Sequence, residues 1–288
     1  MLALAGASGG CAEKVDPSFR ITVGEAHAAL KQMHENPKSL PRPVVVIGGF
    51  LDPGILPPAY EDFVHGISPH APVVLVTPGF AGNFDDCRRM VIDAVEAAYP
   101  SSDPRWTSEV DVIGLSLGGL VARYAAAPSS DPSHPRRLRI ARLFTVSSPH
   151  AGATLAQAVA LNDLERDMVP GSMFLRHLAS EDAAANYELI PYVLLNDEIV
   201  GERYAAPPGR NSYWLDDDSI VPPHAAAMLD ERIMADIARR LRDESPFSKT
   251  PPAPLPLVGQ TIMVSRDVSQ KCKAPGSPGT FVLAGKTD

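Results

Sequence analysis

A glycine-rich turn at residues 114–118 carries the clearest chemical pattern in the chain. These residues read GLSLG, and they lie between the apolar run Val110–Ile113 and a stretch that favours a helix. A G-x-S-x-G pattern between a strand and a helix lifts the serine hydroxyl above the edge of a sheet. The N-terminus of the following helix then stabilises negative charge beside that hydroxyl. The pattern predicts that Ser116 is a nucleophile.

A serine hydroxyl is a poor nucleophile at neutral pH, so it needs a base, which is usually a histidine oriented by a carboxylate. In this strand–turn–helix arrangement the chain order is serine, acid, histidine. The histidines that follow Ser116 are His134, His150, His177 and His224. His134 lies in a proline-flanked loop and His177 in a predicted helix. His224 follows the strand-like stretch Ser212–Leu215 and precedes a helix, so it is the predicted base.

The predicted acid is Asp197, which directly follows the apolar run Tyr192–Leu195 and lies before His224 in the chain. A carboxylate at the end of a buried strand can orient the imidazole of the base. Glu198 is the next choice, and the triplet Asp216–Asp218 also precedes His224. That triplet could instead bind a cation such as calcium, although a solvated acidic turn is the simpler interpretation.

Acyl transfer also requires donors for the oxyanion that forms in the transition state. The N–H of Leu117, the residue after the nucleophile, is the first predicted donor. The second is expected from the loop after the apolar run Val44–Ile47, where Gly48-Gly49 allows a close approach of the backbone. We predict the N–H of Phe50 for this role, with a plain glycine turn as the alternative.

The elements that must position these residues follow an alternating order. Short runs rich in Val, Ile and Leu alternate with segments of helical periodicity, which is typical of a parallel sheet covered by helices. A capping box at Thr22 and Glu25 predicts the start of the first helix. Cys87 lies on the apolar face of another helix and is predicted to be a core residue. The predicted strands are Val44–Ile47, Val73–Val76, Val110–Ile113, Leu143–Val146 and Tyr192–Leu195.

Composition excludes several other classes of protein. The chain has 288 residues, of which 45% are hydrophobic and 21% charged, with a net charge of −8. An acidic chain without a basic patch is not expected to bind nucleic acid. Three cysteines are too few and too scattered for a disulfide framework or a paired zinc site. No stretch approaches the roughly 20 apolar residues that would span a membrane.

The expected organisation is one α/β domain with two atypical ends. Residues 1–20 are expected to be flexible, and their short apolar run before Cys11 is like the end of a lipoprotein signal without its basic region. A cytoplasmic location and a cell-envelope or secreted location therefore both stay open. The domain is expected over residues 21–244, with a helical cap at about 153–190. Residues 245–288 begin with a proline-rich stretch and are predicted to be a poorly ordered tail.

With these residues in place, the chain resembles the lipase and esterase branch of the α/β-hydrolase superfamily over roughly residues 43–241. Besides the GLSLGG turn, the segment TVSSPHAG at 145–152 is similar to the T-P-H-x-G stretch of these lipases. The segment MVPGSMFL at 168–175 is similar to their P-G-S-x-F-L helix, and Asp197 matches the D-x-I-V pattern of the catalytic acid. Gly48-Gly49 replaces the usual His-Gly of the oxyanion loop. The resemblance makes His150 a structural histidine near the site.

The resemblance implies a mostly parallel sheet with helices on both faces and a small helical cap. It implies a serine hydrolase that cleaves esters of lipid or other apolar acyl groups without a metal or organic cofactor. An acyltransferase or thioesterase would use the same residues, and peptidase activity stays open. The non-enzymatic alternatives are an inactive binding protein with this fold and a surface lipoprotein anchored through Cys11.

Overall fold

The computed structural model describes residues 13–14, 16–129, 131–158, 160, 162–216, 220–248, 252–256 and 265–266. Within these residues a six-stranded parallel sheet forms the centre of the molecule, and a short antiparallel pair lies apart from it. The strands of the main sheet are β2 (Val44–Ile47), β3 (Val73–Val76), β4 (Val110–Leu115), β5 (Ile140–Val146), β6 (Glu188–Leu194) and β7 (Tyr213–Leu215). The short pair consists of β1 (Glu13–Lys14) and β8 (Ser265–Arg266).

The strand order of the main sheet is β3-β2-β4-β5-β6-β7. Every neighbouring pair in this order is parallel. The chain therefore leaves β2 in one direction toward β3 and then returns past β2 to build the rest of the sheet from β4. In parallel sheets of this kind, ligands bind outside the carboxyl ends of the strands where the order reverses. The ends of β2 and β4 are that place here.

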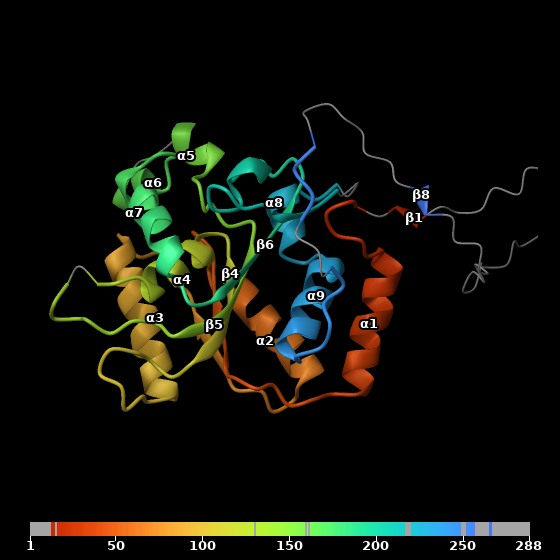
Figure 1. Cartoon of the computed structure of the whole chain (residues 1–288), viewed down its shortest axis with the longest axis horizontal. Helices are drawn as coiled ribbons and strands as arrows, with labels where there is room; N and C mark the ends of the chain where they lie inside the picture. Colours follow the sequence, from red (N-terminus) through yellow and green to blue (C-terminus); the bar gives the residue numbers. More distant parts are fainter. Residues whose placement is uncertain are drawn as a thin grey trace, which may run out of the picture.

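Helices cover both faces of the sheet, as expected (Figure 1). The helices α1, α2 and α9 pack together on one face, and α3 and α4 pack on the other. The remaining helices lie in the connections on either side of β6 and before α9. The bounds are α1 (Val23–Glu35), α2 (Leu56–Ile67), α3 (Phe84–Ala98), α4 (Leu117–Ala126), α5 (Thr154–Ala158), α6 (Asp163–Asp167), α7 (Met173–Glu181), η1 (Asp182–Ala184), η2 (Glu202–Tyr204), α8 (Pro223–Ala227) and α9 (Glu231–Leu241).

The apolar runs form strands because both sides of the sheet are buried. In β2 all the side chains are fully buried, with Val44 and Val46 in one core and Val45 and Ile47 in the other. Side chains alternate across a strand, so a strand covered on both faces must be apolar at every position. At the start of α1 the predicted capping box is present, with both hydrogen bonds between Thr22 and Glu25.

Two strands begin earlier than the apolar runs predict, and the added part of each contains a charged residue that is paired. β5 begins at Ile140, and Arg142 within it donates to the fully buried Asp111 on β4 at 2.6 Å and 3.0 Å. β6 begins at Glu188, which pairs with Arg240 of α9 at 3.3 Å. The buried Asp111 is compatible with a strand interior because of such a partner, whereas Glu188 is exposed at the start of β6. Hydrophobic periodicity does not detect it.

The connection between β5 and β6 contains α5, α6, α7 and η1, within the region where a helical cap is expected. Two of its residues, 159 and 161, lie outside the described part of the chain. Apolar side chains of α6 and α7 pack into the core on the α3 and α4 face of the sheet, among them Leu164, Leu175 and Leu178. None of the described helices is long and apolar enough to cross a bilayer.

Cys11 and most of the two chain ends lie outside the described residues. In the proline-rich stretch, residues 252–256 are described, and they run beside β7. The indole Nε1 of Trp214 donates to the carbonyl of Ala253 at 2.9 Å, and Leu255 packs against the same small core. Cys87 is fully buried in α3, and burial and the nearby Asp86 raise the pKa of its thiol to about 12. Such a thiol is unreactive.

Candidate active site

Ser116 lies in the sharp turn that joins β4 to α4. Its φ of 50° and ψ of −117° are unusual for a residue with a side chain, and its N–H donates to Val146 O at 2.9 Å on the neighbouring strand. The glycines on both sides are required by close packing. A Cβ at Gly118 would lie 2.2 Å from Ile47 O, and a Cβ at Gly114 would lie 2.6 Å from Gly119 N. Backbone strain of this kind is found where function requires it.

His224 approaches Ser116 from the start of α8. Its Nε2 lies 3.2 Å from Ser116 Oγ, although 108 residues separate the two in the chain. Its Nδ1 lies 3.0 Å from both carboxylate oxygens of Asp197. The imidazole is 16% exposed, whereas the carboxylate is fully buried. The structure therefore brings together the three side chains that the sequence singles out.

The loop after β6 holds Asp197 in place. Its Oδ1 accepts the backbone N–H of Ile199 at 3.0 Å and of Val200 at 2.8 Å, in addition to the contact with His224. Burial by itself favours the neutral carboxyl group. The hydrogen bond and charge of His224 and the N–H of Val200 outweigh burial, so the pKa of Asp197 lies below its usual range. The group is ionised at neutral pH.

This arrangement determines the tautomer of His224. An ionised carboxylate can only accept hydrogen bonds, so Nδ1 must carry the proton that it shares with Asp197. In the neutral imidazole the Nε2 atom is then an acceptor, and it faces the hydroxyl of Ser116. The site can therefore remove a proton from Ser116 Oγ and hold the resulting imidazolium beside a fixed negative charge.

The predicted oxyanion loop lies directly beside the nucleophile. A Cβ at Gly49 would be 3.3 Å from Ser116 Cβ and 3.9 Å from its Oγ. Leu117 is the first residue of α4, so its N–H has no acceptor within the helix. Within the described part of the chain, the N–H of Phe50 donates to no backbone carbonyl. Both N–H groups are therefore available to a ligand beside Ser116.

His150 lies close behind this site in a different environment. It is 1% exposed, its Nδ1 lies 3.2 Å from Arg123 Nη1, and its Nε2 lies 2.9 Å from Thr145 Oγ1. Burial, together with the positive charges of Arg123 and Arg210, holds the pKa of His150 well below its usual range. Arg123 extends the network by donating to Asp182 at 2.7 Å and 2.8 Å.

The other candidate acids have different contacts. The Oε2 atom of Glu198 accepts the backbone N–H of His224 at 3.2 Å, so it anchors the start of α8. The backbone of Asp216 takes part in a separate network, whereas Asp217 and Asp218 lie outside the described residues. In the part of the chain that the structure describes, no three His, Cys, Asp or Glu side chains form a group that could hold a metal ion.

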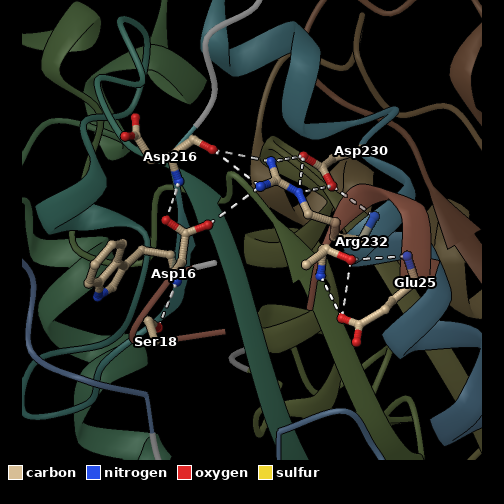
Figure 2. Close-up of polar contacts among 8 residues, drawn as sticks. Asp16, Ser18, Glu25, Asp216, Asp230 and Arg232 are labelled. Atoms are coloured by element: carbon tan, nitrogen blue, oxygen red, sulfur yellow. Dashed lines mark hydrogen bonds and ion pairs between the residues drawn. The ribbon is translucent and has the colours of Figure 1, made fainter. Parts of the chain in front are cut away.

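A charged network that no sequence pattern indicates holds β7, the strand that precedes His224 (Figure 2). Asp16 accepts from the N–H of Asp216 at 3.1 Å and pairs with Arg232 at 3.4 Å. Arg232 of α9 also donates to the carbonyl of Asp216 at 3.3 Å, and to Asp230 at 2.6 Å. The N–H of Trp214 donates to Ser18 Oγ at 3.0 Å. Because about 200 residues separate Asp16 from its partners, no local pattern could have indicated these contacts.

The parallel sheet, the covering helices and the serine turn at the end of β4 are those of the α/β-hydrolase fold. Residues 73–200 match the family model described as "Putative serine esterase (DUF676)". The match runs from β3 to the loop after β6, so it includes Ser116 and Asp197 and ends before His224. A comparison with curated proteins found no match.

A comparison with solved structures finds lipases and esterases at low sequence identity. The lipase BlEst2 from Bacillus licheniformis, in its propeptide form, is 16% identical, covers 75% of this chain and has a TM-score of 0.50. This chain spans only 53% of that lipase. The esterase domain of a Rhodothermus marinus protein is 17% identical, with 69% of this chain and 86% of that domain covered and a TM-score of 0.43.

The phospholipase PlaB from Legionella pneumophila, solved in complex with thio-NAD, is 14% identical. The similarity covers 59% of this chain and 44% of the phospholipase, with a TM-score of 0.40. The expected α/β-hydrolase fold and the expected similarity to lipases and esterases are confirmed by the sheet, by the family match and by the similarity to BlEst2.

Proposed function

We propose that this protein hydrolyses carboxylic esters that carry apolar acyl groups, through an acyl-enzyme formed on Ser116. The observation that carries the proposal is the continuous series of contacts from Ser116 Oγ to His224 Nε2, and from His224 Nδ1 to Asp197. The family match to serine esterases supports the same reaction class.

In the first half of the reaction, Ser116 Oγ attacks the ester carbonyl carbon while His224 Nε2 takes the hydroxyl proton. The electron pair of the carbonyl moves onto its oxygen, and the N–H groups of Leu117 and Phe50 donate to that oxyanion. Collapse of the tetrahedral intermediate breaks the bond to the alcohol oxygen. The departing alcohol takes the proton from His224, which leaves the acyl group on Ser116.

In the second half, water attacks the acyl-enzyme and gives a proton to His224. The second tetrahedral intermediate expels Ser116 Oγ, which recovers its proton from the imidazolium, and the free acid leaves. Asp197 stays ionised throughout and stabilises the imidazolium of each half-reaction. Over both halves one ester and one water give one alcohol and one acid, and Ser116, His224 and Asp197 return to their starting protonation states.

The preference for apolar acyl groups is supported by the oxyanion loop and the segments beside it. Three large apolar side chains there are exposed, namely Leu51 at 58%, Ile55 at 69% and Phe80 at 70%. Leu51 is adjacent to Phe50, and its N–H donates to Gly79 O at 3.1 Å, so the two loops meet beside the nucleophile. An acyl chain that covers these side chains would remove apolar surface from water.

The test is hydrolysis of p-nitrophenyl esters with acyl chains of two to sixteen carbons by the wild type and by Ser116→Ala. Loss of a triad serine is expected to reduce kcat by about 10⁶. Labelling by a fluorophosphonate probe, abolished in Ser116→Ala, would show that the serine is activated.

Turnover of long-chain esters that requires Ser116 is the expected result. Activity restricted to acetyl esters would remove the preference for apolar acyl groups and leave a small-ester esterase. Turnover that is unchanged in Ser116→Ala would contradict the mechanism. No labelling and no turnover on any ester would favour a binding protein with this fold, whereas labelling without hydrolysis would favour transfer to another acceptor.

A further inference from the structure

The oxyanion loop is held from outside by the loop that follows β3. The loop runs from Gly48 to Asp52, and the N–H of Gly48 donates to Val76 O at 2.9 Å, at the end of β3. Leu51 N–H donates to Gly79 O at 3.1 Å, three residues further along. The position of Phe50 N–H, between these two points, therefore depends on residues 76–79.

The loop adopts a conformation that its own residues do not favour. Leu51 has a φ of 55°, in the left-handed region that a branched side chain rarely occupies. The Oδ1 atom of Asp52 accepts the N–H groups of Gly54 and Ile55 at 2.9 Å each, which secures the far end of the loop. A strained conformation of this kind persists only when the surroundings impose it.

Gly79, in the neighbouring loop, packs directly against the oxyanion loop. A Cβ at this position would lie 2.5 Å from Gly49 O, 2.9 Å from Leu51 N and 3.0 Å from Asp52 N. All three are backbone atoms of the oxyanion loop, so no side-chain rotation could relieve the overlap. Gly79 has no positive φ, so other residues could adopt its backbone conformation. The oxyanion loop, which supplies the three nearest atoms, therefore requires a glycine at residue 79.

We propose that Gly79 is a positioning residue that sets the place of the Phe50 N–H relative to Ser116. This inference rests on the proposed function, because it gives Phe50 a role in the reaction. A methyl group at residue 79 pushes the segment from Gly49 to Asp52 away from β3. The N–H of Phe50 then no longer meets the oxyanion, while the contact between Ser116 and His224 is unchanged.

The test compares Gly79→Ala with Gly82→Ala. Both residues lie in the connection between β3 and α3, and both variants add one methyl group, but a Cβ at Gly82 would meet no atom within 4 Å. Complete loss of one oxyanion donor costs about 10² to 10³ in kcat. We expect kcat of Gly79→Ala on p-nitrophenyl butyrate to fall at least tenfold with KM within about threefold of wild type, and Gly82→Ala to match wild type.

A second readout separates the oxyanion hole from general damage. Butylboronic acid forms a tetrahedral adduct with an activated serine and places an oxygen where the oxyanion forms. Its inhibition constant should rise in Gly79→Ala by about the factor by which kcat falls. The pH profile of kcat/KM should keep its shape because His224 and Asp197 are untouched.

If Gly79→Ala does not fold, the double variant that combines Gly79→Ala with Leu51→Gly replaces it in the test. Glycine at residue 51 lets the oxyanion loop move away from the added methyl group, so the double variant folds with a displaced loop. We expect kcat of the double variant to lie at least tenfold below that of Leu51→Gly alone.

Equal kcat for Gly79→Ala and Gly82→Ala would overturn the proposal. So would a Gly79→Ala variant that changes KM but not kcat, or one whose inhibition constant for butylboronic acid equals that of the wild type. Each of these results leaves the wild-type esterase activity and the labelling of Ser116 intact. They are therefore distinct from a failure of the proposed function, in which the wild type itself neither hydrolyses esters nor reacts with the probe.

Discussion

His224 and His150 both lie near the carboxyl ends of β4 and β5, but the groups around their rings carry opposite charges. The Nδ1 atom of His224 faces the carboxylate of Asp197, whereas the Nδ1 atom of His150 faces the guanidinium of Arg123. The first ring is 16% exposed and the second residue 1%. The charge next to Nδ1 therefore decides which ring nitrogen carries the proton in each residue.

The consequence is that the same side chain suits two different roles. A carboxylate accepts from Nδ1, so Nε2 of His224 is free to accept the proton of Ser116. A guanidinium donates to Nδ1, so the proton of His150 must lie on Nε2, which donates to Thr145 Oγ1. Burial and a neighbouring positive charge keep His150 neutral, which suits a packing element and not a base. The site is thus defined by the partner of the histidine as much as by the histidine.

The same substitution at both positions tests this comparison most strongly. His224→Gln should reduce kcat by about 10⁴ to 10⁶, because no group is left to take the proton of Ser116. His150→Gln should stay within about tenfold of wild type, since glutamine can still accept from Arg123 and donate to Thr145. Steady-state kinetics on a p-nitrophenyl ester measure both values. Comparable losses in the two variants would contradict the assigned roles.

Asp197→Asn removes the charge that distinguishes the two histidines. The amide cannot hold the same tautomer of His224, and kcat should fall by about 10⁴. Glu198→Gln is the matched control, because this neighbouring carboxylate accepts the backbone N–H of His224 and not its ring N–H. We expect that control to lower kcat by less than tenfold, and a larger loss in Glu198→Gln than in Asp197→Asn would exchange their roles.

Removing the polar contacts of His150 should affect stability more than catalysis. His150→Leu leaves the buried Arg123 without one of its acceptors and Thr145 without its donor, which costs about 1–3 kcal/mol of unfolding free energy. His150→Gln should lose less, because it can keep both contacts. Urea unfolding of the two variants gives the comparison. If leucine proved as stable as wild type, the network would have no structural role.

The low pKa of His150 predicts a smaller, pH-dependent effect. Below about pH 6.5, His150 is protonated in the unfolded chain but stays neutral in the folded protein. The free energy of unfolding of the wild type therefore decreases as the pH falls. The slope for one proton is about 1.4 kcal/mol per pH unit, and it ends at the folded pKa. His150→Gln lacks this contribution. Unfolding free energies at pH 7, 6 and 5 should converge for wild type and variant, and parallel curves would refute the low pKa.

Much of the fold could be predicted from local pattern. The strands β2 and β3 have the predicted bounds, and the capping box of α1 is where Thr22 and Glu25 place it. The starts of β5 and β6 were missed because Arg142 and Glu188 are paired with residues distant in the chain. In the sequence alone, a charged residue whose partner is not known indicates a loop and not a strand.

In the candidate site, too, some features could be predicted from local sequence and others could not. By itself, the sequence determined the turn around Ser116, because its steric demands involve a few neighbouring residues. From chain order and from positions after strand-like stretches it predicted Asp197 as the acid and His224 as the base. Only the tertiary structure decided which histidine faces a carboxylate and which faces Arg123. Only the structure placed Gly79 against the oxyanion loop and Arg232 against Asp16. Those outcomes depend on the distances between segments far apart in the chain, which the folded sheet sets and local periodicity does not contain.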